Sequence, residues 1–309
     1  MMEKPFGRVA AVIVTFNRKE LLSQNLQMLQ KQTLLPDMIY IIDNHSTDGT
    51  AEHLQANGFF ESLPIDYVYL NENTGGAGGF SFGTQRAYEA GFDFVWLMDD
   101  DGKPCNERTF EILQKKAISL YKSGSRHLML NSLVTYDGYH LAFGLSIDDD
   151  TLCKLRDDED FFLAGKINPF NSTLISREVF ERVGFPNKDF FICVDEMDFR
   201  LRCRLAAVVI GTVGASLYCH PAFARVEKSF LGKKLTVSNF SANKRYYIIR
   251  NKTYSYFVVN RQKGMWLKEM VRDFAAVLFF EKQRMQKIGK MLRGIHDGLK
   301  GRLGKTISL

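Results

Sequence analysis

The sequence lacks any long hydrophobic run. Its longest apolar stretch in the second half, residues 274–280, is far shorter than the roughly 20 residues that span a bilayer. The apolar run at residues 9–14 is too short for the core of a signal peptide and has no small-residue cleavage site after it, so it is predicted to be a first strand. We therefore expect no membrane-spanning segment in this sequence.

Closely spaced cysteine pairs are also absent. The five cysteines are scattered and contain no CxxC motif, which argues against both a zinc site and a disulfide framework. We interpret them as small core residues in a reducing compartment. They are Cys105, Cys153, Cys193, Cys203 and Cys219.

An excess of basic over acidic residues is missing from most of the chain. The net charge is +6, but residues 261–309 contain twelve basic and four acidic residues, a balance of +8, so the first 260 residues carry −2. Because that larger part is not basic and contains no recognition motif, we expect no nucleic-acid partner. Apolar content of 45% is typical of a globular protein with a sizeable core.

Short apolar runs alternate with amphipathic stretches along the first 100 residues. This alternation predicts βαβ units around a mostly parallel sheet flanked by helices, a Rossmann-like α/β fold. The runs are continuous because strands of such a sheet are buried on both faces. The predicted strands are 9–14, 39–42, 67–70, 94–98, 128–134 and 207–213, and the predicted helices are 19–32, 48–57 and 81–91.

Polar residues follow each of the first four predicted strands. Ligands of open α/β sheets bind beyond the carboxyl ends of the strands, so these loops predict a site. The most acidic loop is Asp99-Asp100-Asp101, after a buried strand. Three adjacent carboxylates repel one another, and Asp99 and Asp101 would point to the same side, where both can bind a hard divalent cation. The acidic runs 148–150 and 157–160 are interpreted as solvated turns instead.

The segment 71–80, Asn-Glu-Asn-Thr-Gly-Gly-Ala-Gly-Gly-Phe, opens a predicted helix. Glycines there permit close backbone approach, and free N–H groups at a helix start favour phosphate. A dinucleotide fingerprint or a triphosphate loop would instead follow the first strand, where this chain has Thr15-Phe16-Asn17-Arg18. We therefore disfavour a dehydrogenase and a nucleotidyltransferase.

Six segments in this order resemble the family 2 glycosyltransferases of the GT-A fold: residues 12–18, 41–50, 71–80, 98–101, 190–202 and 218–220. The resemblance implies that Asp99 and Asp101 bind Mg²⁺ or Mn²⁺ beneath the donor diphosphate, with His220 as a third ligand. It also implies that Asp43 lies near uracil. The residues implied in donor binding are Thr15, Asn17, Arg18, Asp43, Asn44, Asn73, Gly75, Gly76, Asp99 and Asp100.

The same resemblance places a catalytic base in Asp195-Glu196. Family members usually carry two adjacent acids, the second of which removes the acceptor proton, so Glu196 is the expected base and Asp195 the alternative. Both acids could instead cap a helix or pair with a nearby arginine. His220 could likewise be a hydrogen-bonded core histidine. A single displacement would invert the anomeric configuration.

The sequences of residues 71–80 and 245–251 (RYYIIRN) are most similar to those of bacterial galactofuranosyltransferases. This resemblance implies UDP-galactofuranose as donor. A rhamnosyl or hexopyranosyl donor is the alternative within the fold, and a catalytically silent sugar-nucleotide-binding scaffold is a third possibility.

The composition of the chain becomes more basic and richer in aromatic residues from about residue 226. We expect a catalytic domain over 1–225 and a basic, mostly helical region over 226–309. Trp266, Met270, Phe274 and residues 285–299 form apolar stripes at helical spacing among basic residues, which suits an anionic membrane surface. The alternative is that the stripes pack on the catalytic domain or on a second subunit of a homo-oligomer. A membrane site would fit a lipid-linked glycan acceptor and a peripheral position on the cytoplasmic face of the membrane.

Overall fold

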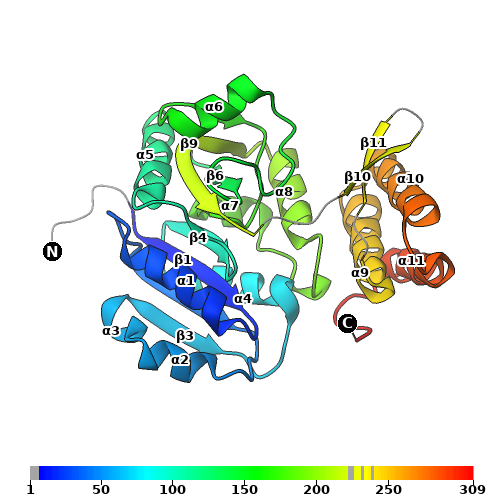
Figure 1. The fold of residues 1–309 in the computed structure, drawn as a ribbon, viewed down its shortest axis with the longest axis horizontal. Coiled ribbons are helices and arrows are strands. Elements are labelled where there is room, and N and C mark those ends of the chain that lie inside the picture. The colour runs from blue at the N-terminus through cyan, green and yellow to red at the C-terminus, as the bar shows by residue number, and fades with distance from the viewer. Residues whose placement is uncertain (1–6, 222–225, 231–232, 238–239, 309) are drawn as a thin grey trace.

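The computed structural model describes residues 7–221, 226–230, 233–237 and 240–308. A nine-stranded sheet forms the centre of the first part of the chain, with helices on both faces (Figure 1). Its strands are β1 (Val9–Thr15), β2 (Met38–Asp43), β3 (Ile65–Tyr69), β4 (Phe94–Asp99), β5 (Lys103–Pro104), β6 (Leu128–Thr135), β7 (Phe162–Ala164), β8 (Thr173–Ser176) and β9 (Val209–Cys219).

The helices of this part connect the strands or cover the sheet. They are α1 (Lys19–Gln30), α2 (Thr50–Ala56), α3 (Phe59–Ser62), α4 (Gly75–Glu89), α5 (Thr109–Lys122), α6 (Asp149–Asp157), α7 (Arg177–Val183), a short 3₁₀ turn η1 (Lys188–Phe190) and α8 (Asp195–Leu205). All six strands predicted from the sequence are present. The predicted helix over 81–91 starts earlier, at Gly75.

The sheet has a parallel half and a mixed half. Its order is β3-β2-β1-β4-β8-β6-β9-β5, with β7 on β9. The four strands from β3 to β4 are parallel, as predicted, but β8 runs antiparallel between β4 and β6. The chain reaches β8 through loops rather than through a crossover helix, so no parallel pairing is imposed there. All of β1 is buried, so this central strand sits in the core.

Two glycines let α4 approach the sheet closely. A Cβ at Gly79 would lie 2.5 Å from Val14, and one at Gly83 would lie 2.5 Å from Val12. Glycine is therefore required at both positions for α4 to lie on β1. This packing fixes the start of α4 at the carboxyl edge of the parallel strands.

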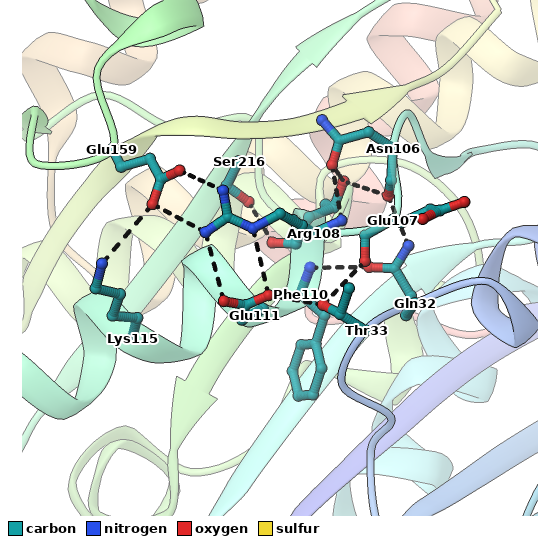
Figure 2. A network of polar contacts seen from close by, with 11 residues as sticks. Gln32, Thr33, Asn106, Glu107, Arg108, Phe110, Glu111, Lys115, Glu159 and Ser216 are labelled. Carbon is teal, nitrogen blue, oxygen red and sulfur yellow. Dashed lines mark hydrogen bonds and ion pairs between the residues drawn. The ribbon is translucent and has the colours of Figure 1, made fainter.

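A polar network ties the segment after the acidic triplet to the rest of the molecule (Figure 2). Gln32 donates to the Asn106 carbonyl at 2.6 Å and accepts from the Phe110 backbone N–H at 3.0 Å. Arg108 forms an ion pair with Glu159 at 2.6 Å. The path of the chain just after Asp101 is therefore held from the loop after α1 and from the loop after α6.

One disulfide corrects the interpretation of the cysteines. Cys105 and Cys219 are bonded, with their Cα atoms 5.1 Å apart. They are 114 residues apart in the sequence, and the antiparallel pairing of β5 with β9 brings them together, so spacing alone could not reveal the pair. Of the free cysteines Cys203 is buried, as predicted, whereas Cys153 is exposed.

The C-terminal part forms a helical lobe beside the sheet (Figure 1). It contains the hairpin β10 (Val226–Phe230) and β11 (Lys233–Val237), then α9 (Ala242–Lys252), a π-helical turn η2 (Thr253–Val259), α10 (Lys263–Phe280) and α11 (Arg284–Leu299). Within the described residues, none of the helices is long and apolar enough to cross a bilayer.

The predicted apolar stripes of this lobe mostly face inward. Met270, Val277 and Met291 are buried with Ile249 of α9, and Trp266 and Phe274 pack against them. The indole N–H of Trp266 donates to Thr253 at 3.0 Å. Trp266 and Phe274 are thus partly buried between α10, α9 and α11, which favours the alternative that they pack within the protein.

Candidate active site

Two carboxylates and an imidazole meet at the carboxyl edge of the sheet. One ligand atom from each of Asp99, Asp101 and His220 lies within 4.8 Å of the others. Asp99 ends β4, Asp101 follows it, and His220 comes directly after β9. The pairing of Lys103 with Cys219 between β5 and β9 places His220 beside the triplet. The three predicted metal ligands are thus brought together.

The ring of His220 is oriented by its backbone surroundings. Its Nδ1 lies 2.8 Å from the Pro221 carbonyl oxygen and its Nε2 lies 3.0 Å from Asp101 Oδ1. A proton on Nδ1 directs the lone pair of Nε2 toward the carboxylates, which is the arrangement a metal ligand needs. Both ring nitrogens have partners, so the same geometry also fits the alternative of a hydrogen-bonded histidine, and the role of His220 as a metal ligand stays a prediction.

The carboxylates of Asp99, Asp100 and Asp101 are partly or fully buried and repel one another. Burial, together with the charges of Asp101 and Asp100, raises the pKa of Asp99 to about 8. Burial also raises the pKa of Asp100, to about 6. Burial acts to raise the pKa of Asp101 too, but its contacts with His220 and Arg18 outweigh burial and lower it. A divalent cation beside Asp99 and Asp101 would relieve this repulsion, so the donor set fits Mg²⁺ or Mn²⁺.

Asp100 is not part of that cluster. It accepts hydrogen bonds from the Thr15 hydroxyl at 2.9 Å and from Arg18 at 3.1 Å. Arg18 also pairs with Asp101 at 2.8 Å. Thr15 and Arg18 therefore hold the acidic loop in place, and their predicted contact with the donor stays a prediction.

The loops after β1 and β2 hold each other. The Asn17 side chain accepts from the Thr47 backbone N–H at 2.7 Å, and Asn17 has a φ of 53°. Asn44 donates to the Gly75 carbonyl at 2.7 Å and accepts from the Thr74 backbone N–H at 2.8 Å. These bonds fix the start of α4 against the end of β2.

Only part of the glycine segment faces open space. The Gly75 backbone N–H donates to the Asn73 side chain at 2.8 Å, and a Cβ on Gly75 would lie 2.0 Å from the Phe191 carbonyl oxygen. Gly76 has no neighbour within 4 Å of such a Cβ. Of these two predicted donor-binding glycines, Gly75 lets the start of α4 lie against the Phe191 backbone, whereas Gly76 is open to a ligand.

Asp43 is fully buried at the end of β2. Its carboxylate accepts from the Ser46 backbone N–H at 2.7 Å and from the Tyr67 hydroxyl. Contact with a nucleobase, as the resemblance implies, would require the covering side chains to move.

Asp195 and Glu196 begin α8. Asp195 is buried, whereas Glu196 is half-buried and lines a large cavity. Burial and the neighbouring carboxylate of Glu196 raise the pKa of Asp195 well above its usual range. Among the residues described, neither acid has a basic partner within 4.0 Å, and the nearby Arg202 pairs with Asp198 instead. The alternative role of these acids, pairing with a nearby arginine, is therefore not seen.

The loop before these acids is held by two residues that sequence reasoning did not assign to the site. Asn251 donates to the carbonyls of Phe190, Ile192 and Cys193 at 2.9–3.0 Å. Arg250 donates to the Phe190 carbonyl at 2.9 Å and to Asn251. The only sequence signal for these two residues was the RYYIIRN segment, which supported the resemblance to galactofuranosyltransferases and assigned them no role.

This loop needs that support because its backbone is unusual. Phe191, Cys193 and Val194 have φ values of 64°, 64° and 73°, in the left-handed region that non-glycine residues rarely occupy. The Phe191 carbonyl also accepts from the Ala77 backbone N–H at 3.1 Å. The loop therefore contacts the start of α4 on one side and α9 on the other, and it leads directly into Asp195.

Comparisons with known proteins agree with this geometry. Residues 10–123 match the family described as Glycosyl transferase family 2. The chain is 28% identical over 291 residues to galactofuranosyltransferase GlfT1 of Mycolicibacterium smegmatis, covering 85% of this chain and 94% of that protein.

Two solved structures are similar in fold. Mannosyltransferase PcManGT from Pyrobaculum calidifontis, in complex with GDP-Man and Mn²⁺, has a TM-score of 0.57 at 14% identity, covering 99% of this chain and 77% of that one. Residues 1–349 of TarS from S. aureus, in complex with UDP-GlcNAc, have a TM-score of 0.51 at 15% identity, covering 95% and 92%. These likenesses support the expected GT-A fold. The chain therefore contains a glycosyl transferase family 2 domain and is a glycosyltransferase.

Proposed function

We propose that this enzyme is an inverting, metal-dependent transferase that moves galactofuranose from UDP-galactofuranose to a hydroxyl of a lipid-linked glycan. The observation that carries the proposal is the cluster that Asp99, Asp101 and His220 form at the carboxyl edge of the sheet. Burial and the charges of Asp101 and Asp100 account for most of the raised pKa of Asp99, and the charge of Glu196 adds to it.

Asp99, Asp101 and His220 would hold the metal. Two carboxylates and one imidazole suit Mn²⁺ or Mg²⁺, and the cation would neutralise charge that develops on the departing diphosphate. Asn17, Asn44, Asn73 and Gly76 lie around the same edge and would contact the nucleotide or its phosphates. PcManGT is in complex with Mn²⁺ and a nucleotide sugar, which supports this assignment.

Glu196 is the better base. Asp195 is buried and burial raises its pKa well above the usual range, whereas Glu196 is half-buried and lines the cavity. Glu196 would take the proton of the acceptor hydroxyl while that oxygen bonds to the anomeric carbon. The bond from that carbon to the donor phosphate breaks on the opposite face, UDP leaves, and the configuration inverts.

The donor assignment rests on the similarity to GlfT1 and on the RYYIIRN segment. Incubation with UDP-, dTDP- and GDP-sugars, with and without Mn²⁺, tests it through the nucleotide diphosphate that is released. UDP-galactofuranose should be hydrolysed or transferred fastest, and only with metal. Preference for a dTDP-rhamnose or a UDP-hexopyranose would replace this donor but keep the enzyme class.

We further propose that residues 1–225 are the catalytic domain and that residues 226–309 hold it on an anionic membrane, at the cytoplasmic face. The lobe exposes a second set of apolar side chains near basic ones. They are Leu267, Val271 and Leu278 on α10 and Met285, Leu292 and Leu299 on α11. These residues take the place of Trp266 and Phe274 as the proposed lipid contacts, and a second copy of the chain is the alternative occupant.

A further inference from the structure

A cavity of about 770 Å³ lies between the two parts of the molecule. One wall comes from the loops around residues 143–146 and 165–171 and from the start of α8, and the other comes from α9 and α10. Glu196 belongs to the wall, so the cavity opens beside the proposed base. Its volume is that of a small-molecule site.

The wall of this cavity is strongly basic. Six basic side chains line it, against the two acids Glu196 and Asp273. Half of the basic side chains are neutralised within the C-terminal lobe: Arg245 pairs with Glu281, Lys252 with Asp273 and Glu269, and Arg272 with Glu269. Lys166 donates to the Ser146 carbonyl.

The positive charges of the other two basic residues, Arg200 and Lys244, are not paired with an acid among the described residues. Arg200 lies one turn after Glu196 on α8, a spacing at which glutamate and arginine commonly pair. In the described parts of the chain, however, neither Arg200 nor Lys244 has an acidic partner within 4.0 Å. The guanidinium and the Glu196 carboxylate therefore line one cavity without neutralising each other.

Lys244 adds a positive charge to the start of α9, which is already the positive end of the helix dipole. It lies in the first turn of α9, which contains no acidic residue. Its ammonium group lies 4.8 Å from the centre of the Phe240 ring. One unpaired cation from each part of the molecule thus faces a cavity that also contains the proposed base.

Building on the proposed function, we infer that this cavity binds the acceptor and that Arg200 and Lys244 bind a phosphate group carried by it. A phosphate ester can accept charge-assisted hydrogen bonds from a guanidinium and an ammonium group together. Phe143, Met197 and Ile248 supply apolar surface for the sugar faces or for the first carbons of a lipid carrier. The acceptor class is thus a glycan linked to its carrier through phosphate, rather than a neutral oligosaccharide.

Calorimetric titration with geranyl phosphate and with geraniol tests the inference without knowledge of the glycan. The full-length protein is first saturated with UDP and Mn²⁺, which occupies the donor phosphate site. We expect geranyl phosphate to bind at least about tenfold more tightly than geraniol. Arg200→Gln and Lys244→Gln should each bring that ratio close to one. Arg182→Gln, an exposed arginine on α7 outside the cavity, should keep it.

Equal affinity of the wild-type protein for the two ligands would overturn the inference, and so would a ratio that survives both substitutions in folded variants. Phosphatidylglycerol vesicles provide a separate arm. If Arg200→Gln and Lys244→Gln weaken vesicle binding but leave the geranyl phosphate ratio unchanged, the cavity binds a lipid headgroup and the acceptor assignment is wrong. Failure of UDP to bind would contradict the proposed donor alone. The ratio is then measured without UDP, and its loss in Arg200→Gln and Lys244→Gln still assigns the phosphate to this cavity rather than to the donor site.

Discussion

At the scale of single residues, Asp101 is the most connected acid of the site. It contacts His220 and Arg18 and shares the cluster with Asp99. We expect Asp101→Asn to lower kcat/KM by roughly 100-fold or more and to weaken Mn²⁺ binding measured by calorimetry. EDTA should abolish transfer, and Mn²⁺ should restore it.

Asp149→Asn is the matched control for this change, because Asp149 is an exposed acid in the first turn of α6. It should leave both metal affinity and turnover unchanged. Normal Mn²⁺ affinity in Asp101→Asn, or full activity in EDTA, would remove Asp101 from the metal site.

The two acids of α8 should respond unequally to neutral substitution. Glu196→Gln keeps the shape and removes the proton acceptor, so kcat should fall by roughly 100-fold or more while the donor KM changes little. Asp195→Asn should be milder, because Asp195 is buried and favours its protonated form. Single-turnover rates of both variants measure this ranking, and the reverse order would make Asp195 the base.

At the scale of elements, α9 acts on the base through the loop of residues 190–194. Asn251→Ala removes three hydrogen bonds to that loop, whose carbonyls would lose their donors at a cost of about 1–3 kcal/mol. We expect kcat to fall at least roughly tenfold, with a smaller change in the donor KM. Asn251→Asp should not rescue turnover, because a carboxylate cannot donate to carbonyls.

Asn243→Ala provides the comparison on the same helix. Within the described residues the Asn243 side chain donates to the Ser308 carbonyl and not to the loop. Its substitution should leave kcat unchanged. If Asn251→Ala lowers the melting temperature but keeps the wild-type kcat, Asn251 stabilises the fold without positioning the base.

These elements also show which features a sequence can predict. The strands β1 to β4 were predictable because each is a local apolar run, and the polar loops after them followed from their shared direction. The antiparallel β8, the Cys105–Cys219 bond and the contacts of Asn251 depend on residues far apart in the chain. No local pattern records such pairings, so they became visible only in three dimensions.

At the scale of the whole molecule, the exposed apolar side chains of α10 and α11 should decide where the enzyme lies. The intact protein should bind phosphatidylglycerol vesicles at low salt, less strongly but still measurably at high salt. Met285→Ser combined with Leu292→Ser should weaken binding at least roughly tenfold, because both side chains are exposed and would enter the lipid.

Leu205→Ser, which removes an exposed leucine from α8, should not change vesicle binding. Co-sedimentation with vesicles and light scattering separate the alternatives. A dimer that ignores vesicles and becomes monomeric in the double variant would show that a second copy covers this face.

The Cys105–Cys219 bond closes residues 105–219 into a covalent ring. Asp101 and His220 lie just outside that ring. Chymotrypsin can cut the ring at Tyr139, which is 63% exposed. With the bond closed, the two fragments of a single cut should migrate together on a denaturing gel. In dithiothreitol they should separate, because after cleavage only the disulfide covalently links the segment with Asp99 and Asp101 to the segment with His220.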